Sequence, residues 1–292
     1  MKNRGGMMSR RKIGLVLSGG GAKGAGQLGM MLYLAEQGLQ PEFISGISVG
    51  SLNATFWAQE GDLHLLERLW REIKGNSDIY KNNWFRPWKL IRSIYDNTPL
   101  WKKIKKYIDL DKLKQSPIEL KIGTVQLQTG AYLLVDKTHH DFQKMLLAST
   151  AIPMVFPAIT YEGRQYVDGG VRDSAPLKPA IQAGCDQIFV LHCYPLEIGE
   201  QMRDFHNLVN IGIRSLAILY NEVLRNDINT CEDINKAVNK GVAFRGGKYR
   251  FIELKLIAPA KDQSFGDELD FSPQLIARNI DLGYQIAKEK LE

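Results

Sequence analysis

Two short apolar runs near the start of the chain each end in a glycine-containing turn that leads into a helix-like stretch. The first run covers 12–18 and precedes Gly-Gly-Gly-Ala-Lys-Gly at 19–24, and a helical pattern follows over 24–37. The second run covers 43–46, and a helical pattern follows over 49–59. Apolar runs without polar alternation predict strands that are buried on both faces. The β-α-β-α order therefore predicts a parallel sheet with helices packed on its faces.

The rest of the chain continues this alternation without an internal repeat or a linker-like stretch. We expect a hairpin of 118–126 and 131–135, a helix over 139–149, a strand over 161–167 that reaches Asp168, a helix near Pro176, a strand over 187–193, a helix at about 205–226, a strand over 250–257 and a closing helix from Ser272. These elements fit one α/β fold, a three-layer α/β/α sandwich with a mainly parallel central sheet.

Composition excludes several classes of protein. The formal net charge of +6 favours anionic surfaces such as phospholipid headgroups but does not require nucleic acid, and we expect no nucleic-acid partner. No window approaches the roughly 18 apolar residues that cross a bilayer, and the basic start lacks a signal-peptide core. We therefore expect a cytoplasmic protein that contacts membranes only peripherally. The 3 cysteines show no C-x-x-C spacing, which favours reduced structural thiols and no metal site.

Residues 46–50 read Gly-Ile-Ser-Val-Gly, between the second apolar run and the helical pattern that follows it. A Gly-x-Ser-x-Gly pentapeptide in this position is the sequence form of a nucleophile elbow, a tight turn that lifts one serine out of the backbone. Gly46 and Gly50 would allow the close approach of the chain on either side. The dipole of the next helix would favour negative charge that develops at the turn. Ser48 is therefore the candidate nucleophile.

The glycine-rich turn at 19–24 has two interpretations. Gly19, Gly21 and Gly24 have the G-x-G-x-x-G spacing of a dinucleotide-binding turn, for which Glu42 would be the ribose-binding acid. Alternatively, the amides of Gly20 and Gly21 form an oxyanion site for a tetrahedral intermediate. We favour the oxyanion site, because the second strand ends in a serine elbow and not in a ribose-binding acid.

Lys23 stands within this turn, at the start of the next helix. A helix N-terminus is an unfavourable place for a cation without a purpose. Lys23 either helps to hold an anionic lipid or positions the loop, or it is a solvated lysine in the first helical turn. The sequence leaves these alternatives open.

A serine hydroxyl needs a partner that accepts its proton. Asp168 ends an apolar and aromatic strand, and Gly169 and Gly170 let the backbone turn and bring its carboxylate to the sheet edge. A carboxylate is a weak base, so partial burial would have to raise its pKa. A triad of Ser48, Asp168 and His192 is the alternative. The remaining histidines are expected to be structural or surface residues: His64, His139, His140 and His206.

Three motifs, in this order, resemble those of the patatin-like phospholipases. They are Gly-Gly-Gly-Ala-Lys-Gly at 19–24, Gly-Ile-Ser-Val-Gly at 46–50 and Asp-Gly-Gly at 168–170. Residues 148–157 also resemble the loop that precedes the aspartate strand of the family. The resemblance covers about 13–183.

This resemblance implies a patatin-like catalytic domain over 13–183, with 184–292 packed on the same α/β domain. It implies a serine acyl hydrolase that cleaves ester bonds of phospholipids, lysophospholipids or related acyl lipids without a metal or cofactor. Ser48 would attack the acyl carbonyl, Asp168 would accept its proton, and the glycine loop would hold the oxyanion. Water would then release the fatty acid from the acyl-enzyme. The competing class is a non-catalytic nucleotide- or phosphate-binding α/β protein, in which Ser48 is incidental.

Residues 79–108 interleave aromatic and basic side chains, and 76–117 match no pattern of the family, so we expect substrate choice to lie there. Near the end of this segment Trp101, Ile104, Tyr107 and Ile108 fall on one helical face and lysines on the other. Such a helix could lie on an anionic membrane surface, which would give peripheral membrane contact through 79–108. Alternatively, it packs on the core with a solvated basic face.

Overall fold

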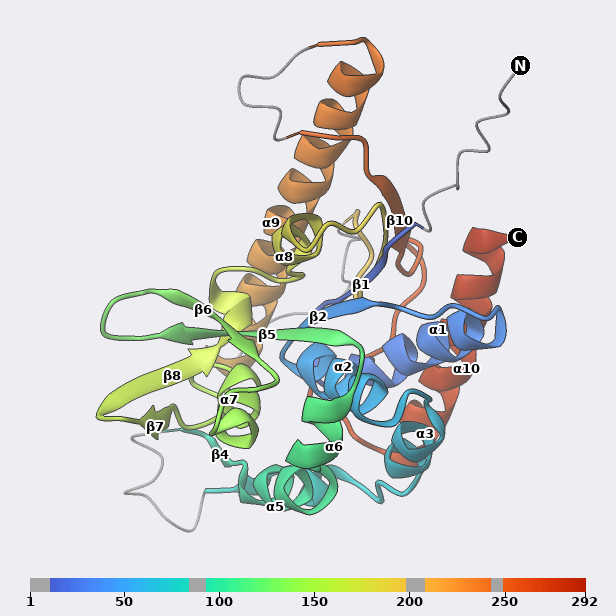
Figure 1. Ribbon diagram of the computed structural model, residues 1–292. Coiled ribbons are helices and arrows are strands. Elements are labelled where there is room, and N and C mark those ends of the chain that lie inside the picture. Colours follow the sequence, from blue (N-terminus) through green and yellow to red (C-terminus); the bar gives the residue numbers. More distant parts are fainter. Residues whose placement is uncertain (1–10, 84–92, 198–207, 243–248) are drawn as a thin grey trace, which may run out of the picture.

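A central sheet organises the part of the chain that the structure, a computed structural model, describes: residues 11–83, 93–197, 208–242 and 249–292 (Figure 1). Its strands are β1 (Ile13–Leu17), β2 (Phe43–Ile47), β5 (Glu119–Gln126), β6 (Tyr132–Asp136), β7 (Ile159–Tyr161), β8 (Arg164–Asp168), β9 (Gln187–Leu191) and β10 (Glu253–Ile257). They follow the order β10-β9-β1-β2-β5-β8-β7, with β6 paired to β5. A separate small ribbon consists of β3 (Lys81–Asn82) and β4 (Tyr95–Asp96).

The sheet is mainly parallel, as the sequence predicted. β10, β9, β1, β2 and β5 pair in parallel, whereas β6 and β8 run antiparallel to β5. The predicted hairpin is therefore confirmed as β5 and β6. The single strand predicted over 161–167 is wrong in its first part, because the chain turns at Glu162 and Gly163, which have φ angles of 47° and 73°. β7 ends before this turn, and β8 continues to Asp168.

Helices surround the sheet in Figure 1. They are α1 (Gly24–Glu36), α2 (Val49–Glu60), α3 (His64–Arg71), α5 (Thr98–Tyr107), α6 (Leu110–Gln115), α7 (Phe142–Ser149), α8 (Leu177–Gln182), α9 (Leu208–Asn239) and α10 (Pro273–Leu291). Single turns of 3-10 helix lie at η1 (Gly21–Lys23), η2 (Asn76–Asp78) and η3 (Gly169–Val171).

The side chains of β1 show why helices cover both faces of the sheet. Leu15 and Leu17 belong to the core that includes α1, α2, α7 and α10, whereas Val16 belongs to a second core with α8 and α9. Successive side chains of a strand point to opposite faces, and burying one such side chain contributes about 1.5–3 kcal/mol. Both faces of β1 therefore need a helical cover, and the predicted three-layer α/β/α sandwich is confirmed.

The C-terminal part packs directly on the N-terminal part. A Cβ on Gly29 of α1 would lie 1.9 Å from the carbonyl oxygen of Ile280 in α10, and a Cβ on Gly283 would lie 1.9 Å from that of Gly26. The two helix backbones therefore touch, which only glycine permits. This contact fixes α1 behind the turn at 19–24. The division of the chain at residue 183 stays a prediction.

Helix α9 runs from Leu208 to Asn239 and is longer than the predicted helix over 205–226. Its second half continues a buried face, because Leu224, Ile228 and Cys231 pack in the second core at helical spacing. Residues 205–207 lie outside the described part of the chain.

Helix α5 keeps its apolar face inside the protein. Ile104 and the following Ile108 are buried in the core, while Lys102, Lys105 and Lys106 are exposed. The helix therefore packs on the core with a solvated basic face, and contact of that face with a membrane stays a prediction. The aromatic and basic residues of 84–92 lie outside the described part of the chain. Within the described ranges, no helix is both long and apolar enough to span a bilayer.

Candidate active site

The carboxyl ends of neighbouring strands bring the predicted motifs together. Leu17 of β1 pairs with Gly46 of β2 on one side and with Leu191 of β9 on the other. The turn at 19–24, the serine elbow and His192 therefore follow adjacent strand ends. After β1 the chain forms β2 on one side of β1, and much later it forms β9 on the other side of β1. The carboxyl end of β1 is therefore a topological switch point of the sheet. Ligands bind at such points in open α/β sheets.

The serine elbow has the backbone geometry that its sequence predicted. Ser48 joins β2 to α2 with φ 54° and ψ −127°, a conformation that costs a non-glycine residue about 1–3 kcal/mol. A Cβ on Gly46 would lie 2.4 Å from the carbonyl oxygen of Gly50, and a Cβ on Gly50 would lie 2.5 Å from that of Leu17. Neither position has room for a side chain. The fold therefore maintains a strained turn at Ser48.

Strand register places Asp168 beside the end of β2. Ile47, the last residue of β2, pairs with Gly123 of β5, and the next residue of β5, Thr124, pairs with Asp168. A Cβ on Gly169 would lie 2.5 Å from the carbonyl oxygen of Gly123, so the turn after Asp168 also approaches β5 closely. The predicted pairing of the elbow with the Asp-Gly-Gly turn is thus a consequence of the register.

The Asp168 carboxyl group is almost fully buried and interacts with the Ser48 hydroxyl. Its exposed fraction is 2%. Burial raises the pKa of Asp168 to about 7, although hydrogen bonds from the Ser48 hydroxyl and the Gly170 amide act to lower it. The Gly170 amide nitrogen lies 2.8 Å from Oδ1 of Asp168. A carboxyl group with a pKa near neutrality is a useful general base.

The glycine-rich turn has two amides beside the serine without an acceptor among the described residues. Gly19 donates its amide to the Ser174 carbonyl oxygen at 3.2 Å. The amides of Gly20 and Gly21 donate to no acceptor in the described part of the chain. Both glycines line a cavity together with Ser48. Their amides are therefore available for an oxyanion, and the oxyanion role of this turn stays a prediction.

Close contacts explain why the turn consists of glycines. A Cβ on Gly20 would lie 2.6 Å from Cβ of Cys193, and a Cβ on Gly24 would lie 2.3 Å from Cγ2 of Val49. Gly21, with φ 56°, would place a Cβ 2.2 Å from a backbone carbonyl oxygen of the segment before α10. A side chain at any of these positions would displace the neighbouring elements.

Lys23 is not a solvated lysine, so that interpretation is wrong. Its exposed fraction is 7%, and its Nζ lies 2.7 Å from Oε1 of Glu268 and 3.9 Å from the ring centroid of Tyr194. The Glu268 carbonyl oxygen also accepts the amide of Ala22 at 2.8 Å. Lys23 therefore positions the loop. Its partner Glu268 lies far along the chain and was not identified from the sequence.

His192 lies near the serine but is engaged elsewhere. Its Nε2 lies 3.0 Å from Oδ1 of Asn221. Burial, together with the nearby Lys23 ammonium, lowers the pKa of His192 to about 4. Among the contacts of the described residues, none joins His192 to Ser48 or Asp168. Of the other histidines, His64, His139 and His140 lie on α3 or before α7, away from the elbow, and His206 lies outside the described residues.

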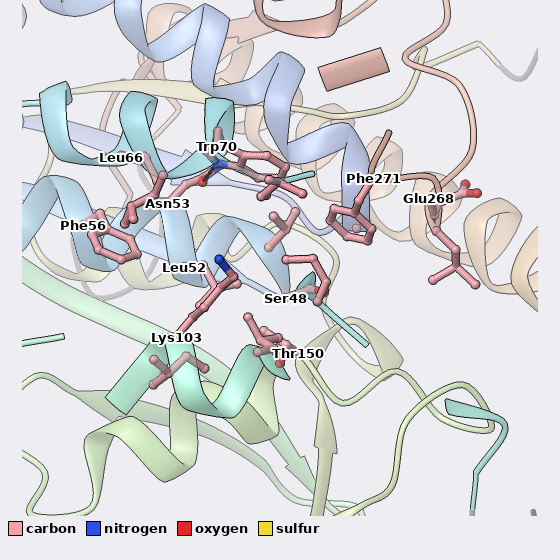
Figure 2. A pocket seen from close by; sticks show the side chains of 18 of the residues that line it. Ser48, Leu52, Asn53, Phe56, Leu66, Trp70, Lys103, Thr150, Glu268 and Phe271 are labelled. Atoms are coloured by element: carbon pink, nitrogen blue, oxygen red, sulfur yellow. Dashed lines mark hydrogen bonds between the residues drawn. The ribbon is translucent and has the colours of Figure 1, made fainter. Parts of the chain in front are cut away.

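An apolar pocket of about 110 Å³ opens beside Ser48 (Figure 2). Leu52 and Phe56 line it from α2, at i+4 and i+8 from the serine, and therefore extend along the same face of the helix. The other walls come from α3, α5, the chain between these helices, the segment after α7 and the segment before α10. Their apolar lining includes Leu66, Leu69, Trp70, Ile73, Ile79, Leu100, Ile104, Tyr107, Ile152, Phe156, Leu269 and Phe271, and Lys103 and Thr150 also line the pocket. A long apolar group attached at Ser48 would find a continuous apolar surface here.

The walls of this pocket only partly match the sequence prediction. Residues 76–117, where substrate choice was expected, contribute one side of the pocket through α5. Helix α3 was not assigned to the site, although Leu66, Leu69, Trp70 and Ile73 show helical spacing on one face. That spacing was a sufficient signal for an amphipathic helix, but it did not reveal which cavity the apolar face would line.

The dinucleotide interpretation does not fit the arrangement. Glu42 precedes β2, at the edge of the sheet opposite the elbow, and its Oε2 accepts the Ile13 amide at 3.2 Å. It is therefore not placed to bind the ribose of a nucleotide held at 19–24. In the described part of the chain, no group of three or more His, Cys, Asp or Glu side chains is arranged to bind a metal ion.

Comparisons with known proteins agree with this geometry. A model of the patatin-like phospholipase family matches residues 15–181. Lysophospholipase NTE1 of Saccharomyces cerevisiae is 24% identical over 219 residues, which cover 70% of this chain and 12% of the relative. Lysophospholipase NTE1 of Kluyveromyces lactis is 24% identical over 215 residues, which cover 70% of this chain and 14% of the relative. The chain thus matches only a small part of the length of these relatives.

The fold is also similar to a solved structure. The crystal structure of VipD from Legionella pneumophila aligns with a TM-score of 0.51 and 15% identity, and covers 96% of this chain and 67% of that one. At this identity the likeness concerns the fold alone. Because the family model spans more than half of the chain and includes all three motifs, the chain belongs to the patatin-like phospholipases, a family of lipid acyl hydrolases.

Proposed function

We propose that the chain hydrolyses ester bonds of acyl lipids through a dyad of Ser48 and Asp168. The observation that carries this proposal is the strained Ser48 beside the buried carboxyl group of Asp168, at the mouth of an apolar pocket. A serine hydroxyl becomes a nucleophile when an adjacent base accepts its proton. Family membership supports the same chemistry.

In the first step, Ser48 Oγ forms a bond to the acyl carbon while its proton moves to Asp168. The negative charge on the carbonyl oxygen is held by the amides of Gly20 and Gly21, and a pair of such donors typically contributes several kcal/mol to the transition state. The bond to the leaving alcohol then breaks, and Asp168 returns the proton to the alcohol oxygen. In the second step, water repeats the sequence on the acyl-enzyme and releases the fatty acid.

Two observations favour the dyad over a triad with His192. The imidazole is committed to Asn221 through Nε2, and its low pKa makes it a poor base near neutral pH. Asp168, in contrast, has a pKa of about 7 and interacts with the hydroxyl of the nucleophile. Under the dyad, His192→Ala retains covalent labelling of Ser48, whereas under the triad it loses it.

We infer that lysophospholipids are the first substrate class to test. The pocket beside Ser48 is a single apolar cavity, which suits one acyl chain held along α2. The relatives from both yeasts carry the name lysophospholipase. Phospholipids with two chains would have to leave the second chain outside this cavity.

We also propose that α5 carries the enzyme to anionic lipid surfaces. Lys102, Lys105 and Lys106 are exposed on this helix, while Lys103, Ile104 and Tyr107 line the pocket. One helix thus connects a basic surface with the wall of the acyl site. Basic side chains near an anionic membrane each contribute about 1 kcal/mol to binding.

The direct test is release of fatty acid from lysophosphatidylcholine, compared with phosphatidylcholine that carries the same acyl chain. We expect turnover by the wild type, a preference for the lysophospholipid, and loss of at least about 10³-fold in Ser48→Ala and Asp168→Asn. A fold control by circular dichroism accompanies both variants. Undiminished release by Ser48→Ala would contradict the proposal.

A further inference from the structure

A second, smaller cavity borders the same serine. We call it the polar chamber, and the polar side chains in its lining belong to Ser48, Asp168, Ser174, His192, Tyr194, Tyr220 and Glu268. Its volume is about 30 Å³. Helix α9, which takes no part in the apolar pocket, contributes Tyr220 and an apolar wall. The two cavities therefore meet at Ser48, where they also share Gly21, Ile152, Glu268 and Leu269, and α9 lines only the second.

Tyr220 places a buried hydroxyl in the chamber next to the dyad. A Cβ on Gly170 would lie 3.0 Å from Cζ of Tyr220 and 3.1 Å from Oδ1 of Asp168. The Tyr220 ring and the Asp168 carboxyl group therefore both lie beside Gly170. The hydroxyl oxygen of Tyr220 is buried and has no hydrogen-bond partner among the described residues. Burial and the nearby Asp168 carboxylate raise the pKa of Tyr220, which keeps its proton available for donation.

His192 supplies a hydrogen-bond acceptor. Asn221 donates Nδ2 to the Leu196 carbonyl oxygen at 2.8 Å, which fixes the amide so that Oδ1 faces His192. Because Oδ1 can only accept, Nε2 of His192 carries the proton, and Nδ1 of the neutral ring is an acceptor. Nδ1 is buried and has no partner in the described part of the chain. Buried polar atoms of this kind require a partner.

The size of the chamber restricts its ligand. A cavity that holds one water molecule needs a volume of about 10–15 Å³, measured in the same way as the volume of the chamber, and two to four polar partners for the water. The chamber is large enough for one or two water molecules and too small for a glycerol or a phospholipid headgroup. Its groups also match the four hydrogen-bonding positions of water, since Tyr220 can donate, His192 Nδ1 and Asp168 can accept, and one lone pair stays free.

We propose that the polar chamber holds the water that hydrolyses the acyl-enzyme, with Tyr220 and His192 as positioning residues. This inference rests on the proposed function. The water donates one hydrogen bond to His192 Nδ1 and one to Asp168, and accepts one from Tyr220. Its free lone pair forms the bond to the acyl carbon, and its proton moves to Asp168. The bond from that carbon to Ser48 Oγ then breaks, the proton passes to Oγ, and a fatty acid leaves.

The test separates acylation from deacylation with p-nitrophenyl butyrate as the acyl donor. Tyr220→Phe removes one oxygen that has no hydrogen-bond partner among the described residues, so the fold should persist. We expect kcat and KM to fall together by roughly five- to tenfold, with kcat/KM unchanged, because the loss of one hydrogen bond affects only the second step. Acid quenching and intact-protein mass should show a larger fraction of butyrylated Ser48. His192→Ala should behave in the same way.

Tyr166→Phe is the control, because it removes a phenolic hydroxyl two residues before Asp168 that lies outside the chamber and accepts a hydrogen bond from Gln126 Nε2 at 3.0 Å. It should leave both kcat and the acylated fraction unchanged. A fall of kcat/KM in Tyr220→Phe without accumulation of the acyl-enzyme would overturn the role of the chamber. Failure of the wild type to form any adduct at Ser48 would instead contradict the proposed function, so the two failures are distinguishable.

Discussion

The ammonium of Lys23 lies 2.7 Å from the carboxylate of Glu268, and both side chains are largely buried. This ion pair joins the glycine-rich turn to the segment before α10, 245 residues further along the chain. The Glu268 carbonyl oxygen binds the Ala22 amide in the same contact. The conformation of the turn, and with it the direction of the Gly20 and Gly21 amides, therefore depends on the C-terminal part of the chain.

Glu268→Gln should weaken both stability and acylation. The variant leaves the buried Lys23 without its counter-charge, which should cost about 2 kcal/mol or more in the free energy of unfolding. We expect kcat/KM for esters to fall about tenfold as the amides lose their alignment. Urea unfolding and ester hydrolysis measure the two effects. Asp262→Asn, an exposed change in the same segment, is the control and should alter neither. Full activity and stability of Glu268→Gln would contradict this role.

Activity should depend on the ionisation of Asp168. The residue accepts a proton only as a carboxylate, and its pKa is about 7. We therefore expect kcat/KM, which reports the free enzyme, to rise with pH through about 7 and to level off above it. Initial rates between pH 5 and 9 test this expectation. A profile that is already flat at pH 5 would show that the base has an ordinary carboxyl pKa.

The same raised pKa predicts a stability effect of definite sign. The native state binds the Asp168 proton more tightly than the unfolded state, so the contribution of this group to stability is lost as pH rises from about 4 through 7. Asp168→Asn removes the buried charge. The variant should therefore exceed the wild type in stability at pH 8 by about 2 kcal/mol or more, and this excess should shrink toward pH 4. An excess that does not depend on pH would contradict the raised pKa.

The apolar pocket should determine acyl-chain length. Leu52 lies one helical turn beyond Ser48 and lines the pocket. Leu52→Trp should fill the space along α2 and reduce kcat/KM for long-chain esters by more than about tenfold, because roughly 0.8 kcal/mol is lost for each CH₂ that stays unburied. Acetate esters and labelling of Ser48 should change little. Leu127→Trp, at a position that is 49% exposed, is the control. An equal fall in kcat/KM for short and long esters would show that the acyl chain does not bind in the apolar pocket.

The basic face of α5 should govern binding to anionic vesicles. Replacing Lys102, Lys105 and Lys106 by Gln removes three exposed charges and retains Lys103 in the pocket wall. We expect binding to vesicles with phosphatidylserine to weaken at least about tenfold, with unchanged hydrolysis of a soluble ester.

A control for this prediction is the same charge change at Lys236, Lys240 and Lys288, which are exposed near the C-terminal ends of α9 and α10. These helix ends lie far from α5 in Figure 1. Binding that falls equally in both triple variants would indicate an effect of net charge. Binding that is unchanged in the α5 variant would exclude this helix as the docking surface.

The local features of the fold were predictable because short-range rules determine them. Apolar runs gave β1, β2 and β9, and the Gly-x-Ser-x-Gly spacing located the strained turn at Ser48. The break between β7 and β8 was missed because Glu162 adopts a positive φ that its residue type does not suggest. Helix α9 was predicted too short, because its second half has polar residues between the buried positions.

The contacts that complete the site were not predictable in the same way. Lys23 and Glu268 are joined only by the folded chain, and no local pattern links them. Tyr220 lies on α9, whose position over η3 depends on packing across the second face of the sheet. Sequence spacing identified the nucleophile and its partner, while the walls around them result from tertiary packing.

The central claim is that Ser48 is an activated nucleophile, and covalent labelling tests it most directly. Intact-protein mass is measured after treatment with a fluorophosphonate for the wild type, Ser48→Ala and Asp168→Asn, each verified as folded. The account predicts one adduct on the wild type, none on Ser48→Ala, and labelling of Asp168→Asn that is slower by a factor of about 10² or more. No adduct on the folded wild type, or an equal adduct on Ser48→Ala, would contradict the account.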